Sequence, residues 1–141
     1  MNWKLAQRTL MLAVLALTSS LLAFSQSNTN PPADPKAVPV LDGGIGPCSA
    51  DFTITDPAGA PVYAAKINVH IAYGFLSAHK LDLEVGTNAD GKARFTGLPN
   101  HVKRGLYFEA SEGDRAGEAF VDPGVTCKSQ FTIVLRKKKE E

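Results

Sequence analysis

Apolar and polar residues alternate one by one in seven short stretches of the chain. The stretch 66–73 is the clearest, because Ile67, Val69 and Ile71 alternate with Asn68 and other polar or small residues. Successive side chains of a β-strand point to opposite faces, so this alternation predicts strands with one buried and one exposed face. The seven stretches are residues 51–55, 66–73, 80–85, 92–95, 106–110, 115–121 and 130–135.

Turn-forming residues separate these stretches. Asp56–Gly59 follows the first stretch, and Asn88–Gly91 follows the third, where an Asp-Gly pair predicts a tight hairpin turn. Gly97–Asn100 and Asp122–Gly124 end later stretches. No twelve-residue window has the 3.6-residue period of an amphipathic helix. The pattern therefore predicts an all-β, Ig-like or prealbumin-like sandwich of about seven strands.

The first 25 residues have the pattern of a secretory signal peptide. Lys4 and Arg8 precede an apolar run from Leu10 to Phe24, and residues 23–25 give a small-x-small cleavage pattern. We therefore predict cleavage near Ser25, a secreted or periplasmic location, and no stable membrane span afterwards. A retained membrane anchor is the alternative, although the run is short for a span and contains three hydroxyl side chains.

Proline and glycine are concentrated in residues 26–46, which we predict to be a flexible leader. Proline removes backbone donors, glycine raises the entropy cost of ordering, and few large apolar side chains offset that cost. The predicted organisation is a signal peptide at 1–25, the leader at 26–46, the sandwich at 47–135 and a charged tail at 136–141.

Composition and charge narrow the function only slightly. The chain of 141 residues is 44% hydrophobic and 21% charged, as in an ordinary globular protein. Its net charge of +1 gives no bulk electrostatic argument for binding nucleic acid or an anionic membrane. We predict no nucleic-acid partner.

Cys48 and Cys127 are the only cysteines, and we predict that they form a disulfide. Counting by twos from Cys48 reaches Phe52 and Ile54, and counting from Cys127 reaches Phe131, so both sulfurs start on the core side. Both cysteines also begin their strands, and they lie at the same end if the two strands run parallel. Two separate buried thiols are the alternative, and a metal site would need more ligands.

Several segments carry a family resemblance. Residues 52–62 contain a strand followed by D-x-x-G-x-P, residues 65–69 fit A-x-V-x-V, and residues 87–99 fit T-x-x-D-G-x-F-x-F-x-x-L-P with one alanine substituted. In order and spacing they resemble the carboxypeptidase regulatory-like domain family, which has a transthyretin-like sandwich. The stretch 74–79 looks like an insertion relative to that family. The resemblance implies a non-catalytic accessory module of an exported or surface protein.

The three histidines are the candidates for catalysis or metal binding. His70 lies on the polar face of a predicted strand, whereas His79 and His101 lie in different loops, and no pair has metal-ligand spacing. We predict no catalytic residue, metal or cofactor. The alternative is a transthyretin-like hydrolase or metal-dependent enzyme using all three, although the Tyr-Arg-Gly-Ser ending of that hydrolase family is absent. Asp82 and Glu84 share one strand face and could bind a cation, with a solvated face as the alternative.

We therefore predict an exported, non-catalytic module with a binding or structural role at the cell envelope or outside the cell. Its partner would be a polysaccharide or an envelope or extracellular protein. Tyr63, Tyr73 and Tyr107 could form a sugar-binding face, with strand packing as the alternative. We expect the binding surface around the loops 74–80 and 100–104. Its candidate residues are Tyr73, His79, Lys80, His101, Lys103 and Arg104.

Overall fold

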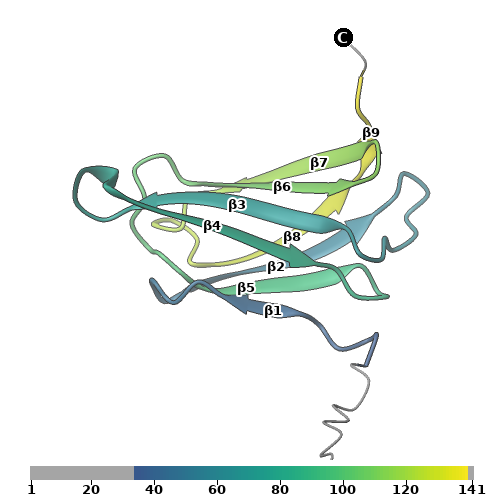
Figure 1. The fold of residues 1–141 in the computed structure, drawn as a ribbon, viewed down its shortest axis with the longest axis horizontal. Coiled ribbons are helices and arrows are strands. Elements are labelled where there is room, and N and C mark those ends of the chain that lie inside the picture. The colour runs from purple at the N-terminus through teal and green to yellow at the C-terminus, as the bar shows by residue number, and fades with distance from the viewer. Residues whose placement is uncertain (1–33, 140–141) are drawn as a thin grey trace, which may run out of the picture. The chain divides into compact units, whose positions relative to one another are not determined.

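The computed structural model describes residues 34–139 and places them in two β-sheets packed face to face (Figure 1). The predicted signal peptide lies outside these residues. The all-β sandwich prediction is confirmed, and no helix in this part of the chain is long and apolar enough to cross a membrane. The strands are β1 (Val40–Asp42), β2 (Cys48–Thr55), β3 (Lys66–Tyr73), β4 (His79–Gly86), β5 (Lys92–Leu98), β6 (Leu106–Glu112), β7 (Arg115–Val121), β8 (Lys128–Val134) and β9 (Arg136–Lys137), and η1 (Phe75–Ser77) is a 3-10 turn.

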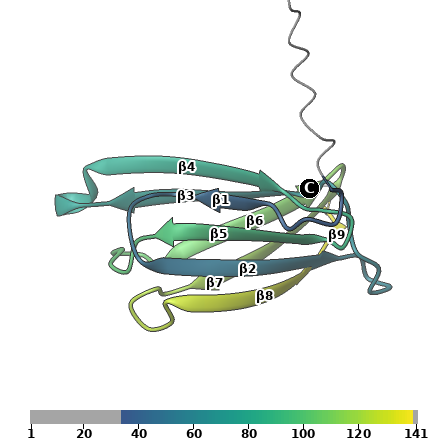
Figure 2. The same ribbon diagram turned by 90° about the horizontal axis from the view of Figure 1, so that it is seen from below.

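The strands form one sheet of four and one sheet of five. The first has the order β1-β5-β2-β8, and the second has the order β4-β3-β6-β7-β9. Figure 1 shows the five-stranded sheet above the other, and Figure 2 views both from the four-stranded side. β3 and β4 form an antiparallel hairpin, as do β6 and β7, whereas β2 and β8 run parallel from the pair Ser49–Lys128 to the pair Thr55–Val134.

The period-two alternation produces the core. Each second residue of β2 is buried, and its Phe52 lies at the centre of an aromatic cluster. The Phe52 ring centroid is 5.9 Å from that of Phe95, 4.8 Å from that of Phe108 and 5.4 Å from that of Phe131. Phe108 belongs to the five-stranded sheet, so its tilted contact with Phe52 joins the two layers.

The predicted disulfide between Cys48 and Cys127 is present, with the two Cα atoms 4.6 Å apart. Cys48 begins β2, and Cys127 immediately precedes β8, which runs parallel to β2. The Ser49 amide also donates to the Cys127 carbonyl at 2.8 Å. Strand parity and parallel pairing therefore bring the two sulfurs together, as the sequence predicts.

Two short strands lie where the sequence analysis predicted none. β1 falls in the segment predicted as a flexible leader and pairs in parallel with β5. Leader residue Lys36 is also held, because its carbonyl accepts a hydrogen bond from Asn88 Nδ2 at 2.8 Å. β9 falls in the predicted charged tail and pairs with β7. Backbone pairing, which needs no apolar pattern, holds both strands.

The turn before β5 corrects one prediction. Gly91 has the expected positive φ of +70°, but the turn is not a hairpin, because it carries the chain from β4 in one sheet to β5 in the other. Thr87 stabilises this connection between the two sheets. Its buried hydroxyl accepts from the Ala65 amide at 2.9 Å and donates to the Val62 carbonyl at 2.6 Å.

Candidate functional site

The β3–β4 loop and the β5–β6 loop meet at one end of the sandwich. Tyr73 and Leu76 from the first loop region line a shallow hollow together with His101 and Lys103 from the second. The six residues predicted for the binding surface all lie at this end, although η1 and the intervening strand β5 separate them in sequence.

A larger hollow beside it is basic. It has a volume of about 620 Å³ and is lined by Lys80 from β4, Lys103 and Arg104 from the β5–β6 loop, and His70 and Tyr107 from the sheet. No described carboxylate lines it, and within residues 34–139 none of its three Lys and Arg side chains forms an ion pair. We call it the basic hollow. Its cations are therefore available to an external anion.

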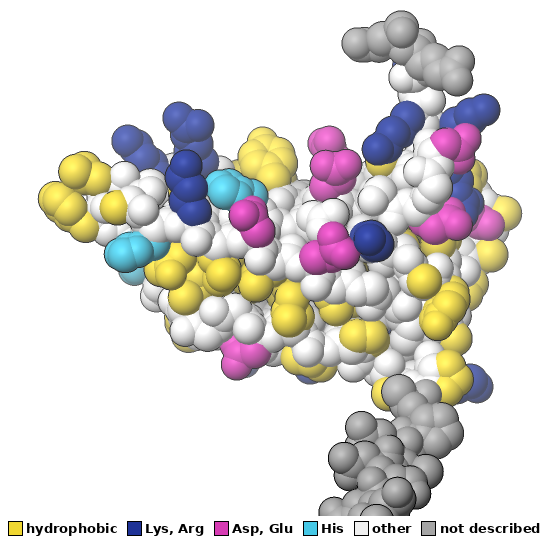
Figure 3. Space-filling view, viewed as in Figure 1, with side chains coloured by type: hydrophobic (Ala, Val, Ile, Leu, Met, Phe, Trp, Pro, Cys, Tyr) yellow, Lys and Arg dark blue, Asp and Glu magenta, His cyan; other side chains and the backbone are white. Residues whose placement is uncertain are grey.

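An apolar tip lies at the same end. Phe75 and Leu76 are 86% and 84% exposed, and we call this pair the apolar tip. Leu76 has a φ of +54°, a left-handed conformation that disfavours bulky side chains, and Gly74 has a φ of +79°. Figure 3 shows the hydrophobic tip next to a gathering of Lys and Arg side chains. The break in alternation predicts this loop from sequence, but not its exposed apolar pair.

An exposed aromatic pair lies on the outer face of the five-stranded sheet, next to the basic hollow. Tyr107 of β6 and Phe120 of β7 are paired across the strands with ring centroids 4.6 Å apart. They are 64% and 48% exposed. Gly105 makes room for this pair, because a Cβ atom there would lie 2.5 Å from the Phe120 ring.

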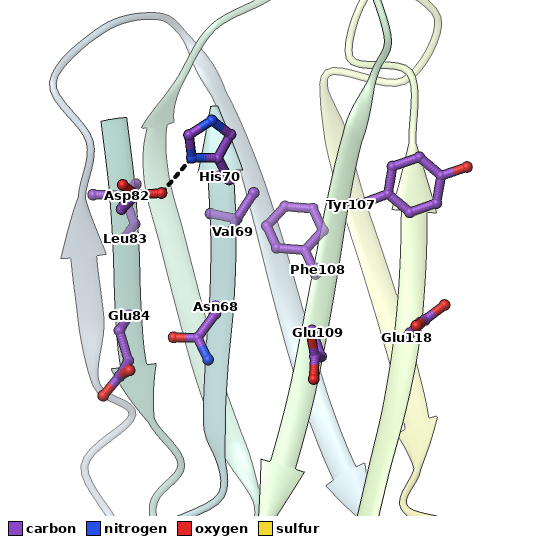
Figure 4. A pocket seen from close by; sticks show the side chains of 10 residues that line it. All are labelled: Asn68, Val69, His70, Asp82, Leu83, Glu84, Tyr107, Phe108, Glu109 and Glu118. Atoms are coloured by element: carbon purple, nitrogen blue, oxygen red, sulfur yellow. Dashed lines mark hydrogen bonds and ion pairs between the residues drawn. The ribbon is translucent and has the colours of Figure 1, made fainter. Parts of the chain in front are cut away.

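Carboxylates occupy the next positions along the same face (Figure 4). Glu84, Glu109 and Glu118 lie around a hollow with Asp82, and Glu109 pairs directly with Glu118 across β6 and β7. His70 Nδ1 contacts the Asp82 carboxylate. In the part of the chain that the structure describes, no group of three or more His, Cys, Asp or Glu residues is arranged to hold a metal. The outer face is thus divided into a basic end, an aromatic middle and an acidic region.

The structure does not bring the three histidines into one site. His70 points to the outer face of β3, beside Asp82. His79 pairs with Tyr73, which is three residues from His70, so its side chain lies on the opposite face. The His79 and Tyr73 rings are 5.4 Å apart, and His101 lines the hollow beside Tyr73. His70 therefore shares no site with His79.

Two arginines away from this end have raised pKa values. A side-chain hydrogen bond from Arg94 to Asp51, with their charge attraction second, raises the pKa of the Arg94 guanidinium above its ordinary value. The hydrogen bond to Glu112 does the same for the pKa of Arg115, with partial burial opposing it. Neither arginine lines the basic hollow, and both stabilise strand pairs.

No protein-family model matches the chain, and no curated protein matches it in sequence. Similar solved structures include 3-chlorocatechol 1,2-dioxygenase from Rhodococcus opacus 1CP, with 12% identity and a TM-score of 0.45 over 72% of this chain and 64% of that chain. Another is catechol 1,2-dioxygenase from Acinetobacter radioresistens, with 14% identity and a TM-score of 0.42 over 74% and 60%. The chain thus matches less than two thirds of each enzyme, and similarity at this level carries no argument about activity.

Proposed function

We propose that this chain is an exported, non-catalytic β-sandwich module that binds an acidic polysaccharide at the envelope or outside the cell. The observation that carries the proposal is the exposed pair Tyr107–Phe120 beside the three cations of the basic hollow. The resemblance to carboxypeptidase regulatory-like domains fits such an accessory role. The disulfide fits export, because disulfides persist in oxidising compartments.

The aromatic pair has the properties of a sugar platform. Aromatic rings pack on the apolar faces of sugar rings, and a tyrosine hydroxyl adds a polar contact. Tyr107 and Phe120 are held by neighbouring strands rather than by a flexible loop, so little conformational entropy is lost when a ligand binds. Gly105 keeps the space beside Phe120 open.

The separation of basic and acidic side chains on the outer face favours an acidic ligand. It also favours one orientation of that ligand along the strands. Lys80, Lys103 and Arg104 can donate charge-assisted hydrogen bonds to carboxylate or sulfate groups. Glu109 and Glu118 lie two positions from Tyr107 and Phe120 on their strands, away from the loop end, and repel such groups. A sugar stacked on Tyr107 would therefore extend its acidic groups toward the loop end.

Calorimetric titration with polygalacturonate and alginate oligosaccharides, and with neutral dextran, tests this proposal on the chain starting at Gln26. We expect the acidic oligosaccharides to bind and dextran to bind much more weakly. Tyr107→Ala should weaken binding by about tenfold or more, because stacking on that ring is lost. Tyr63→Ala is the matched control, since Tyr63 is 65% exposed and lies in the β2–β3 loop.

Three results would contradict the proposal. The first is equal binding of the Tyr107→Ala and wild-type proteins. The second is no binding of any acidic polysaccharide. The third is the release of new reducing ends from the bound polymer, which would make the chain an enzyme.

A further inference from the structure

We infer that the apolar tip and the cations beside it form a docking site for the surface of an anionic lipid bilayer. This inference goes beyond the proposed function, because it rests on Phe75 and Leu76 and concerns a different target. The net charge of +1 gave no reason to expect such a site. The reason lies in how the fold distributes the charges.

The apolar tip is exposed at a conformational cost. Phe75 and Leu76 have no packing role in the core, because the two residues are 86% and 84% exposed. Leu76 also takes a left-handed backbone conformation that glycine would adopt more easily. A large apolar side chain that gains nothing from folding at such a position is explained by a contact outside the sandwich.

The cations of the basic hollow lie next to the apolar tip, where they could contact lipid phosphates. Leu76 and Ser77 line the basic hollow together with Lys80, Lys103 and Arg104, so the tip and the positive charges are neighbours. When apolar side chains enter a bilayer interface, adjacent Lys and Arg side chains reach the phosphate level and attract anionic lipids. No described carboxylate lines either hollow at this end.

The shape of this end allows a flat surface to approach. In Figure 1 the β3–β4 loop extends beyond the neighbouring strands at one end of the sandwich, while β9 lies at the opposite end. The C-terminal strand therefore does not cover the tip.

The small size of the tip favours a bilayer over a protein partner. A standard protein interface buries roughly 800 Å² on each partner. Two side chains provide only a small part of that area. A bilayer needs no such area, because a few inserted apolar groups and a few cations act together at its surface.

Sedimentation with vesicles tests the inference on the chain starting at Gln26. The vesicles are phosphatidylcholine with 30% phosphatidylglycerol, and pure phosphatidylcholine is compared with them. We expect clear binding to the anionic vesicles and weak binding to the neutral ones. Phe75→Ser with Leu76→Ser should weaken binding by about tenfold or more. Lys103→Glu with Arg104→Glu should weaken it by at least about twentyfold, since each cation contributes about fivefold.

Matched variants provide the controls. Tyr63→Ser removes an exposed ring elsewhere, and Lys92→Glu with Lys138→Glu reverses two exposed charges outside the basic hollow, so both should bind vesicles like the wild type. Tyr107→Ala should lose polysaccharide binding and keep vesicle binding, whereas Phe75→Ser, at a residue that lines neither hollow, should weaken vesicle binding and keep polysaccharide binding. If vesicle binding fails but polysaccharide binding is observed, only the membrane inference is overturned, and the proposed function is unaffected.

Two outcomes would overturn the inference. The first is vesicle binding that does not depend on phosphatidylglycerol or on the tip. The second is a dimer in sedimentation velocity that the tip variant abolishes, because a second copy of the chain would then cover the tip.

Discussion

Cys48 lies beside Cys127, with the Cα atoms 4.6 Å apart, although the two cysteines are 79 positions apart in sequence. The bond joins the starts of two parallel strands, β2 and β8, which are the first and last long strands of the sandwich. It therefore closes almost the whole sandwich into a single covalent loop.

Cys48→Ala with Cys127→Ala should lower the free energy of unfolding by about 2–4.5 kcal/mol. The upper value is the chain entropy that a loop of this length removes from the unfolded state. Urea unfolding of the variant and the wild type measures the difference, and wild type with a reducing agent should match the variant. A loss under about 1 kcal/mol would mean that the unfolded chain is compact without the bond.

Thr87→Val should lower the free energy of unfolding by about 2–4 kcal/mol. The valine has nearly the same shape, but it leaves the Ala65 amide and the Val62 carbonyl without their hydrogen-bond partner in a buried place. Thr87→Ser keeps the hydroxyl and should lose at most about 1 kcal/mol. A larger loss for Thr87→Ser than for Thr87→Val would show that the methyl group, and not the hydroxyl, stabilises this connection.

Gly97→Ala should destabilise the fold by about 2–5 kcal/mol and release β1. A Cβ atom at Gly97 would lie 1.9 Å from Asp42 Oδ1 and 2.4 Å from the Gly44 nitrogen, in addition to the strain of its φ of +64°. Gly113→Ala separates the two effects, because Gly113 has a φ of +58° and open space around it. It should cost only about 1–2 kcal/mol. Faster amide exchange at Gly43 and Ile45 in the first variant alone would identify the release of β1.

Leu76→Gly should raise the free energy of unfolding by about 0.5–1 kcal/mol. Glycine relieves the left-handed strain at this position, and the exposed leucine contributes little burial to the fold. Phe75→Gly is the control, because Phe75 lacks a positive φ and glycine there should cost about 0.5–1 kcal/mol. Opposite signs in urea unfolding would confirm that Leu76, and not Phe75, is strained. A destabilised Leu76→Gly would show that the leucine packs in the fold.

The long strands and the disulfide could be predicted from sequence, because each depends on a local pattern. Alternation in β2 places Phe52 and Ile54 in the core, and the same parity places Cys48 there. Short strands cannot be predicted from a local pattern of alternation. β1 contains only three residues, and its pairing depends on β5, which lies more than fifty residues away.

The candidate site could be predicted only in part. The two loops were identified from breaks in the alternation, but their meeting depends on the strand order of the five-stranded sheet. The pairing of Tyr107 with Phe120 depends on the register of β6 and β7, which the turn at Gly113 helps to set. A sequence pattern places a residue on a face, and only the register identifies its neighbour.

The disulfide also determines how the molecule would respond to mechanical force. Tension applied along the chain from its two ends enters at Cys48 and passes directly through the bond to Cys127, so the loop between the two cysteines carries none of it. A stretched molecule can then lengthen only through the residues outside the two cysteines. In single-molecule pulling, reduction should add about 260–280 Å of extension, the reach of a fully extended chain of that length.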